Sequence, residues 1–213
     1  MKTDDLISML AASATPVPTH VASRRLLTAL LVGLPLSFVF MQWVFGLRRD
    51  LMEVMTWPMF WVRLLFPVCI AAGAYLMVER LSRPGVKVRK AWLGLAVPVL
   101  VVWGMAAYML VSAPAEERPA LVMGQTWRTC TANIAFVALP VFVAALVALK
   151  GLAPTRPALA GAAAGLMAGG AGAAIYALHC VELAAPFFAV WYVLGISLPA
   201  VVGALIGSRF LRW

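Results

Sequence analysis

Two cysteines and their neighbours form the densest group of reactive side chains in this sequence. Cys130 stands in the segment Trp127-Arg128-Thr129-Cys130, and Cys180 stands in His179-Cys180-Val181-Glu182. A thiolate is a nucleophile and a soft metal ligand, and a nearby cation such as Arg128 or a protonated His179 favours the thiolate form. The pair therefore suits a protein that senses a metal or an oxidant better than it suits an enzyme.

Three interpretations of the pair are open from the residues alone. A structural disulfide requires no function and is favoured by an oxidising compartment. A metal site would combine Cys130, Cys180 and His179, with Glu182 beside them, and this set suits Zn, Cd or Cu(I). An oxidant sensor would use the two thiols alone. We expect no constitutive cofactor, and any bound metal would be transient.

The elements that must position these thiols are membrane-spanning helices. Apolar residues make up 64% of the chain, well above the roughly 45 to 50% of ordinary globular proteins. A helix needs about 20 apolar residues to cross a membrane, and six runs are long enough: residues 26–47, 59–78, 91–111, 130–149, 158–178 and 184–206. We predict an all-α integral membrane protein, with an N-terminal arm at residues 1–25 and a six-helix transmembrane domain at residues 26–213.

The basic residues predict the orientation of this domain. Of the 17 Lys and Arg residues, 12 fall in the arm, in the second and fourth loops and in the C-terminal tail. The positive-inside rule then predicts that both termini are cytoplasmic and that the cysteines are on the opposite side. Because the charges are spread over separate short segments, we expect no direct nucleic-acid binding. The basic loop from Arg80 to Lys90 is expected to contact anionic lipid or an acidic partner.

Several residues within the spans have structural interpretations. Gly161, Gly165 and Gly169 recur at intervals of four, a spacing that lets helix backbones pack closely. Arg63 lies about one turn inside its span and is expected to extend its side chain to the membrane interface. Cys69 is interpreted as a small buried hydrophobic residue, and Asn133 is expected to bond a neighbouring helix.

The same composition weighs against catalysis and transport. Enzymes that shuttle disulfides generally use a Cys-x-x-Cys pair, which this chain lacks. No carboxylate falls within the predicted spans, whereas ion pathways normally place ionisable groups near the bilayer centre. We expect that the protein is not an enzyme. A small metal or metabolite transporter remains the alternative function.

The first dozen residues predict a short docking helix. Thr3 is a suitable N-cap, and Asp4 and Asp5 suit the positive end of a helix dipole. Leu6, Ile7 and Leu10 would share one face of the helix. A helix of this length is marginal in water, so we expect it to fold on a partner or on the membrane surface.

The chain as a whole resembles the NrsF-type membrane anti-sigma factors, which are negative regulators of extracytoplasmic-function sigma factors in bacteria. The resemblance rests on the opening residues 1–7, on residues 124–130, on His179-Cys180-Val181-Glu182 with residues 191–196, and on the tail Leu211-Arg212-Trp213. Proline often follows each cysteine in that family, whereas Thr131 and Val181 occupy those places here.

The resemblance implies a function for both ends of the chain. The arm, through Asp4, Asp5, Leu6, Ile7 and Leu10, would hold a sigma factor away from RNA polymerase. Heavy metal or oxidant acting on periplasmic Cys130 and Cys180 would release it. The protein would then be a multi-pass protein of the bacterial inner membrane.

Overall fold

Helices account for all the regular structure in the part of the chain that the computed structural model describes, which is residues 3–13, 20–83, 91–152 and 154–212. Their order is α1 (Thr3–Ser13), α2 (Val21–Val44), α3 (Leu51–Val54), α4 (Pro58–Leu81), α5 (Leu93–Ser112), α6 (Arg118–Met123), α7 (Trp127–Lys150), α8 (Pro157–Tyr176) and α9 (Ala185–Phe210). Six stretches, in α2, α4, α5, α6 with α7, α8 and α9, are long and apolar enough to cross a membrane. The predicted all-α class is therefore confirmed, and six helices are long and apolar enough to be the predicted spans, whereas α3 and α6 were not predicted.

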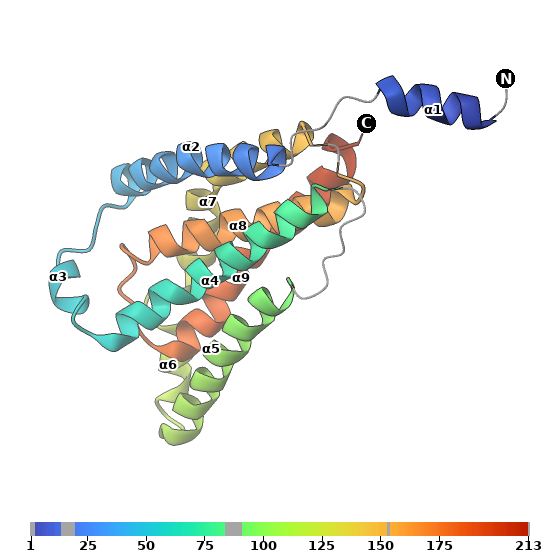
Figure 1. Ribbon diagram of the computed structural model, residues 1–213. Helices are drawn as coiled ribbons and strands as arrows, with labels where there is room; N and C mark the ends of the chain where they lie inside the picture. Colours follow the sequence, from blue (N-terminus) through green and yellow to red (C-terminus); the bar gives the residue numbers. More distant parts are fainter. Residues whose placement is uncertain (1–2, 14–19, 84–90, 153, 213) are drawn as a thin grey trace.

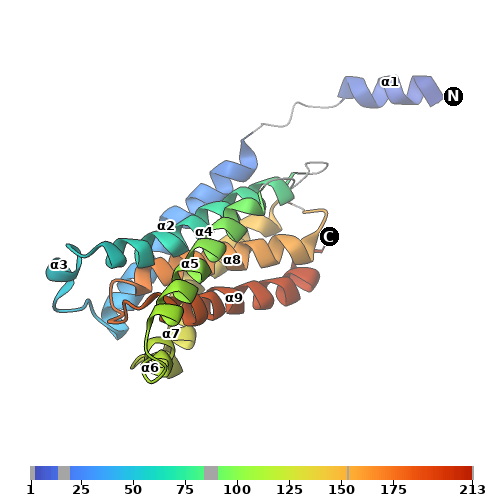
Figure 2. The ribbon, with the colours of Figure 1, turned by 90° about the horizontal axis from the view of Figure 1, so that it is seen from below.

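Helix α8 lies at the centre of the bundle and is packed on three sides by α9, α4 and α7 (Figures 1 and 2). Helix α2 packs mainly on α7, and α5 packs on α4 and α9 at the edge. Five of the long helices contain an internal proline, namely Pro35, Pro67, Pro98, Pro140 and Pro199. Helix α8 has none inside it and is instead composed largely of glycine and alanine, so its narrow surface admits neighbours on several sides.

The glycines of α8 are the points of closest approach between helices. A Cβ built on Gly161 or Gly165 would overlap the backbone of α9 at Gly203 or Pro199, and one on Gly169 would lie 2.6 Å from the carbonyl oxygen of Ile196. The close packing expected from the four-residue spacing is therefore what the structure shows. Gly170 and Gly172 on other faces approach α4 and α7 in the same way.

Replacing Gly165 with alanine should destabilise the bundle. The added methyl group has to push α8 and α9 apart, and overpacking of this kind costs about 1–3 kcal/mol. Gly104→Ala in α5 is the matched control, because a Cβ there meets nothing within 4 Å and alanine is the better helix former. Thermal unfolding in detergent should show a lower Tm for G165A and an unchanged or higher Tm for G104A. Equal Tm values for the two variants would contradict this packing.

The two ends of the bundle, whose elements Figure 1 shows, differ in the charged residues of their sequence. The cysteine end holds α3, α6 and the segment that joins α8 to α9, with the carboxylates Asp50, Glu53, Glu116, Glu117 and Glu182. The termini end holds the start of α2 and the C-terminal end of α9, with Arg24, Arg25, Lys150, Arg156, Arg209 and Arg212. The side of the membrane that each end faces stays a prediction.

Helix α1 lies apart from the bundle in both views (Figures 1 and 2). Its residues from Thr3 to Ala12 are exposed, and Ile7 and Leu10 are 58% and 62% accessible. The predicted short helix is therefore present and displays apolar side chains. Residues 14–19 of the arm, residues 84–90 of the basic loop and Trp213 of the tail lie outside the described residues.

Candidate functional site

The structure brings Cys130 and Cys180 together at the cysteine end. Cys130 lies in the first turn of α7, and Cys180 lies in the segment that joins α8 to α9, residues 177–184, hereafter the Cys180 segment. Both are free thiols, at 0% and 2% exposure, and each influences the ionisation of the other. The site is thus a buried thiol pair formed from two segments 50 residues apart.

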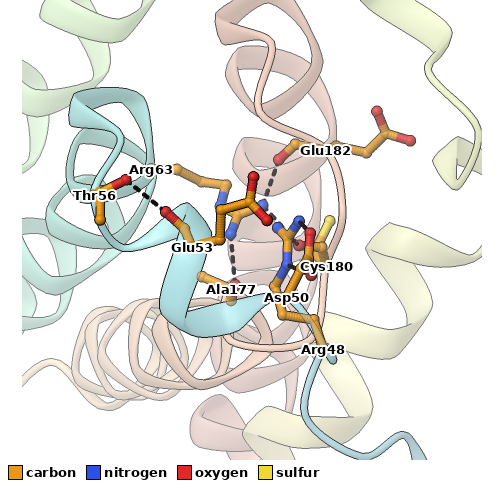
Figure 3. A network of polar contacts seen from close by, with 8 residues as sticks. All are labelled: Arg48, Asp50, Glu53, Thr56, Arg63, Ala177, Cys180 and Glu182. Atoms are coloured by element: carbon orange, nitrogen blue, oxygen red, sulfur yellow. Dashed lines mark hydrogen bonds and ion pairs between the residues drawn. The ribbon is translucent and has the colours of Figure 1, made fainter.

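Arg63 of α4 holds the Cys180 segment in place (Figure 3). Its Nη1 donates to the carbonyl oxygens of Cys180, at 2.8 Å, and of Glu182, and its Nη2 donates to that of Ala177, at 2.7 Å. The side chain is fully buried, so the expectation that it extends to the membrane interface is wrong. The physical reason is that three carbonyl oxygens beyond the end of α8 supply the solvation that water would otherwise provide.

A second arginine reaches the same segment from the connection between α2 and α3 (Figure 3). Arg48 donates from Nη1 to the Cys180 carbonyl oxygen at 3.1 Å and makes two bonds of 2.7 Å to the Asp50 carboxylate. The bidentate pair raises the pKa of Arg48 and lowers the pKa of Asp50. Arg48 therefore reaches the thiol site with its charge already matched by a carboxylate.

Glu182 fastens the Cys180 segment to the start of α7. Its carboxylate accepts hydrogen bonds from the backbone N–H groups of Gln125, at 2.6 Å, and Thr126, at 3.2 Å. Gly124 has a φ of +54°, and a Cβ there would lie 2.6 Å from the Glu182 carboxylate. The left-handed backbone conformation and the lack of room for a side chain both require glycine at this position. A carboxylate at this position satisfies amide donors at the N-terminus of the helix that carries Cys130.

Replacing Glu182 with glutamine should weaken this cap. The charge is lost while the shape is kept, and capping interactions of this kind contribute about 1 kcal/mol. For a chain of this size we expect a Tm lower by roughly 2–4 °C. Glu116→Gln is the control, because Glu116 is exposed at the same end of the bundle. Thermal unfolding of the two variants makes the comparison, and an equal Tm for E182Q and E116Q would rule out the cap.

His179 points away from the thiols. Its Nδ1 lies 2.9 Å from the carbonyl oxygen of Gly46, and its ring packs against Phe45 and Tyr176. Among the residues that the structure describes, no group of three His, Cys, Asp or Glu side chains is arranged to hold a metal ion. The predicted set of Cys130, Cys180 and His179 is therefore not assembled in this conformation.

Arg128 and Cys69 do not lie where the sequence predicted, which was beside the thiols for Arg128 and in the core for Cys69. The guanidinium of Arg128 packs over the Trp127 ring, 5.2 Å from its centroid, and Arg63 and Arg48 are the arginines that bond the Cys180 segment. Cys69 is exposed on α4, so the prediction that it is buried is wrong; an apolar run does not reveal which face of a helix meets its neighbours.

Asn133 donates to the Tyr176 hydroxyl of α8 at 3.2 Å, which confirms the expected contact with a neighbouring helix.

The surroundings of Cys180 favour its thiolate form. The neighbouring Cys130 thiol has the largest effect, which lowers the pKa of Cys180, and the Glu182 N–H and the Arg63 charge act in the same direction. Burial acts against them, because desolvation disfavours the charged form. The two thiols are therefore not equivalent, because Cys180 is the one that the Arg63 charge and the Glu182 N–H favour as a thiolate.

Fold and site together define an all-α, multi-pass membrane protein with a buried thiol pair at one end. The sequence matches the family described as "Negative regulator of sigma F" over residues 10–213. It is 47% identical to the probable anti-sigma-F factor NrsF of Azospira oryzae and 40% identical to the anti-sigma-F factor NrsF of Caulobacter vibrioides, in both cases over the full length of both chains. No solved structure matches the chain. The chain belongs to the NrsF family and is a regulatory protein, not an enzyme.

Proposed function

We propose that this protein is a membrane-bound anti-sigma factor that sequesters an extracytoplasmic-function sigma factor through its N-terminal arm. The observation that carries the proposal is α1, an exposed helix that stands apart from the bundle and displays Leu6, Ile7 and Leu10. Apolar side chains on one face of a free helix are what a groove-binding partner requires. The names of the two full-length relatives support a sigma factor as that partner.

The proposal places both termini in the cytoplasm and the cysteine end in the periplasm, with the bundle in the inner membrane. The concentration of arginine and lysine at the termini end supports this orientation. Anionic lipid headgroups would then meet Arg24, Arg25 and Arg80 on the cytoplasmic face. The sigma factor would be held on the same side as RNA polymerase.

The signal acts on Cys130 and Cys180. Two neighbouring free thiols can be joined by an oxidant into a disulfide or bridged by a soft heavy-metal ion. Structural zinc normally takes four ligands, and the described residues offer no third ligand beside the pair. Oxidation, or two-coordinate binding of a soft ion such as Cu(I), is therefore the chemistry that the pair supports best, with Cd as a further thiol-reactive signal.

Co-purification from bacterial membranes tests the function. The tagged full-length protein should retain a sigma factor, identified by mass spectrometry, and a variant that lacks residues 3–13 should enter the membrane without retaining it. A deletion variant that still holds the sigma factor would remove α1 from the proposal. Failure of the full-length protein to retain any sigma factor would refute the function itself.

A further inference from the structure

Arg63 is the most deeply buried charge in the described part of the chain and has no carboxylate partner there. An uncompensated charge in an apolar span is costly unless it is densely hydrogen-bonded. Its three acceptors, the carbonyl oxygens of Ala177, Cys180 and Glu182, all belong to the Cys180 segment. One side chain thus fixes the backbone on both sides of Cys180.

The other charged groups near Cys180 are already matched or turned away. Asp50 neutralises Arg48 through two hydrogen bonds, and the Glu182 carboxylate points to the amides that precede α7. The His179 ring faces Gly46. The titratable and charged groups packed around the thiol site are, by element, Arg63 from α4, Arg48 from the α2–α3 connection, Cys130 from α7, Tyr176 from α8 and Tyr192 from α9. Glu182 and His179 belong to the Cys180 segment itself, and their side chains are turned away from the thiols.

We propose that Arg63 is the positioning residue of the thiol pair: by clamping the Cys180 segment it holds Cys180 against Cys130 and makes Cys180 the thiol that reacts first. The proposal deepens the function proposed above, since it concerns the same two cysteines. It assigns the two thiols different roles, with Cys180 as the attacking sulfur and Cys130 as the thiol beside it.

Methylthiolation of the full-length protein in detergent tests the proposal. The Cys180 thiolate attacks the sulfenyl sulfur of methyl methanethiosulfonate, a new S–S bond forms, and methanesulfinate leaves with the bonding pair. Mass spectrometry of peptides follows Cys130 and Cys180 separately as a function of time and pH. The wild-type protein should be modified at Cys180 before Cys130, with a pH midpoint for Cys180 below the value of about 8.5 for a free thiol.

Arg63→Met and Arg63→Lys distinguish a role of Arg63 in positioning Cys180 from a role in stabilising the fold alone. R63M should raise the Cys180 midpoint by about one pH unit and remove its preference over Cys130, whereas R63K retains the charge and should restore part of both. Arg128→Met is the matched control and should leave the profile unchanged. A residue that only supported the fold would change rates without moving the midpoint.

Two results would overturn the proposal: modification of Cys130 before Cys180 in the wild-type protein, or an unchanged Cys180 midpoint in folded R63M. The first needs no variant, so the test stands even if R63M does not fold. Sigma-factor retention is measured on the same samples. If the midpoint moves as expected but thiol modification never releases the sigma factor, the proposed function fails while the role of Arg63 stands.

Discussion

Replacing Leu6 and Leu10 with aspartate is expected to abolish retention of the sigma factor. The two side chains lie on one face of α1 and are 41% and 62% exposed, so the change should leave the bundle intact. Burying an exposed leucine side chain contributes about 1.5–3 kcal/mol, so losing two of them costs about 3 kcal/mol or more. Affinity should therefore fall by roughly 100-fold or more, as measured by co-purification and by binding of the sigma factor to the protein in nanodiscs.

The control for this variant adds the same charge to the other side of α1. Ser8 and Ala12 lie opposite the Leu6 and Leu10 face by helical periodicity, and both are exposed. The S8D/A12D variant should retain the sigma factor at close to the wild-type level. Equal loss in the two variants would mean that charge, and not an apolar face, controls binding.

Replacing both Cys130 and Cys180 with serine is expected to produce an anti-sigma factor that no longer responds to thiol reagents. Serine keeps a hydroxyl that can bond within the pair but cannot form a disulfide or bind a soft ion. Basal retention of the sigma factor should be unchanged, and induction of a sigma-dependent promoter by Cd²⁺ or by a thiol oxidant should be lost. Reporter expression with and without each reagent gives the measurement.

Cys69→Ser supplies the control for the cysteine variants. Cys69 is exposed on α4 and takes no part in the thiol pair, so C69S should respond as the wild-type protein does. Normal induction in the C130S/C180S variant would reduce the pair to a structural element. Loss of induction in C69S as well would point to general damage to the bundle.

The sequence predicted the apolar helices and the common end of the two cysteines because both follow from local properties. Apolar run length determines which segments can cross a membrane. Two spans, α7 and α8, lie between Cys130 and Cys180 in the sequence. A chain that crosses the bundle twice returns to the end from which it started, so the two cysteines lie at the same end. The glycine spacing of α8 likewise predicted close packing, since small residues at intervals of four lie on one helix face.

What the sequence could not predict depends on how each helix is rotated and how each connection is folded. Arg63 and Cys69 lie on the same helix, yet Arg63 faces the thiol site and Cys69 does not. Arg128 is adjacent to the cysteine region in sequence, but Arg48 and Arg63, from distant segments, are the arginines that bond it. Arg63 could have been identified from the free-energy cost of burying a charge. A charged side chain inside an apolar span requires a partner within the protein.

In the proposed mechanism, chemistry at Cys130 and Cys180 releases a sigma factor held at the opposite end of the bundle, about 30 Å away across the membrane. The most direct measurement uses oriented vesicles that carry the full-length protein with a bound, fluorescently labelled sigma factor on the arm side. A membrane-impermeant thiol oxidant is added to the cysteine side only, and release is followed over time. Vesicles with the wild-type protein should release the sigma factor and those with C130S/C180S should not. A wild-type protein that keeps its sigma factor after both thiols are oxidised would contradict this mechanism.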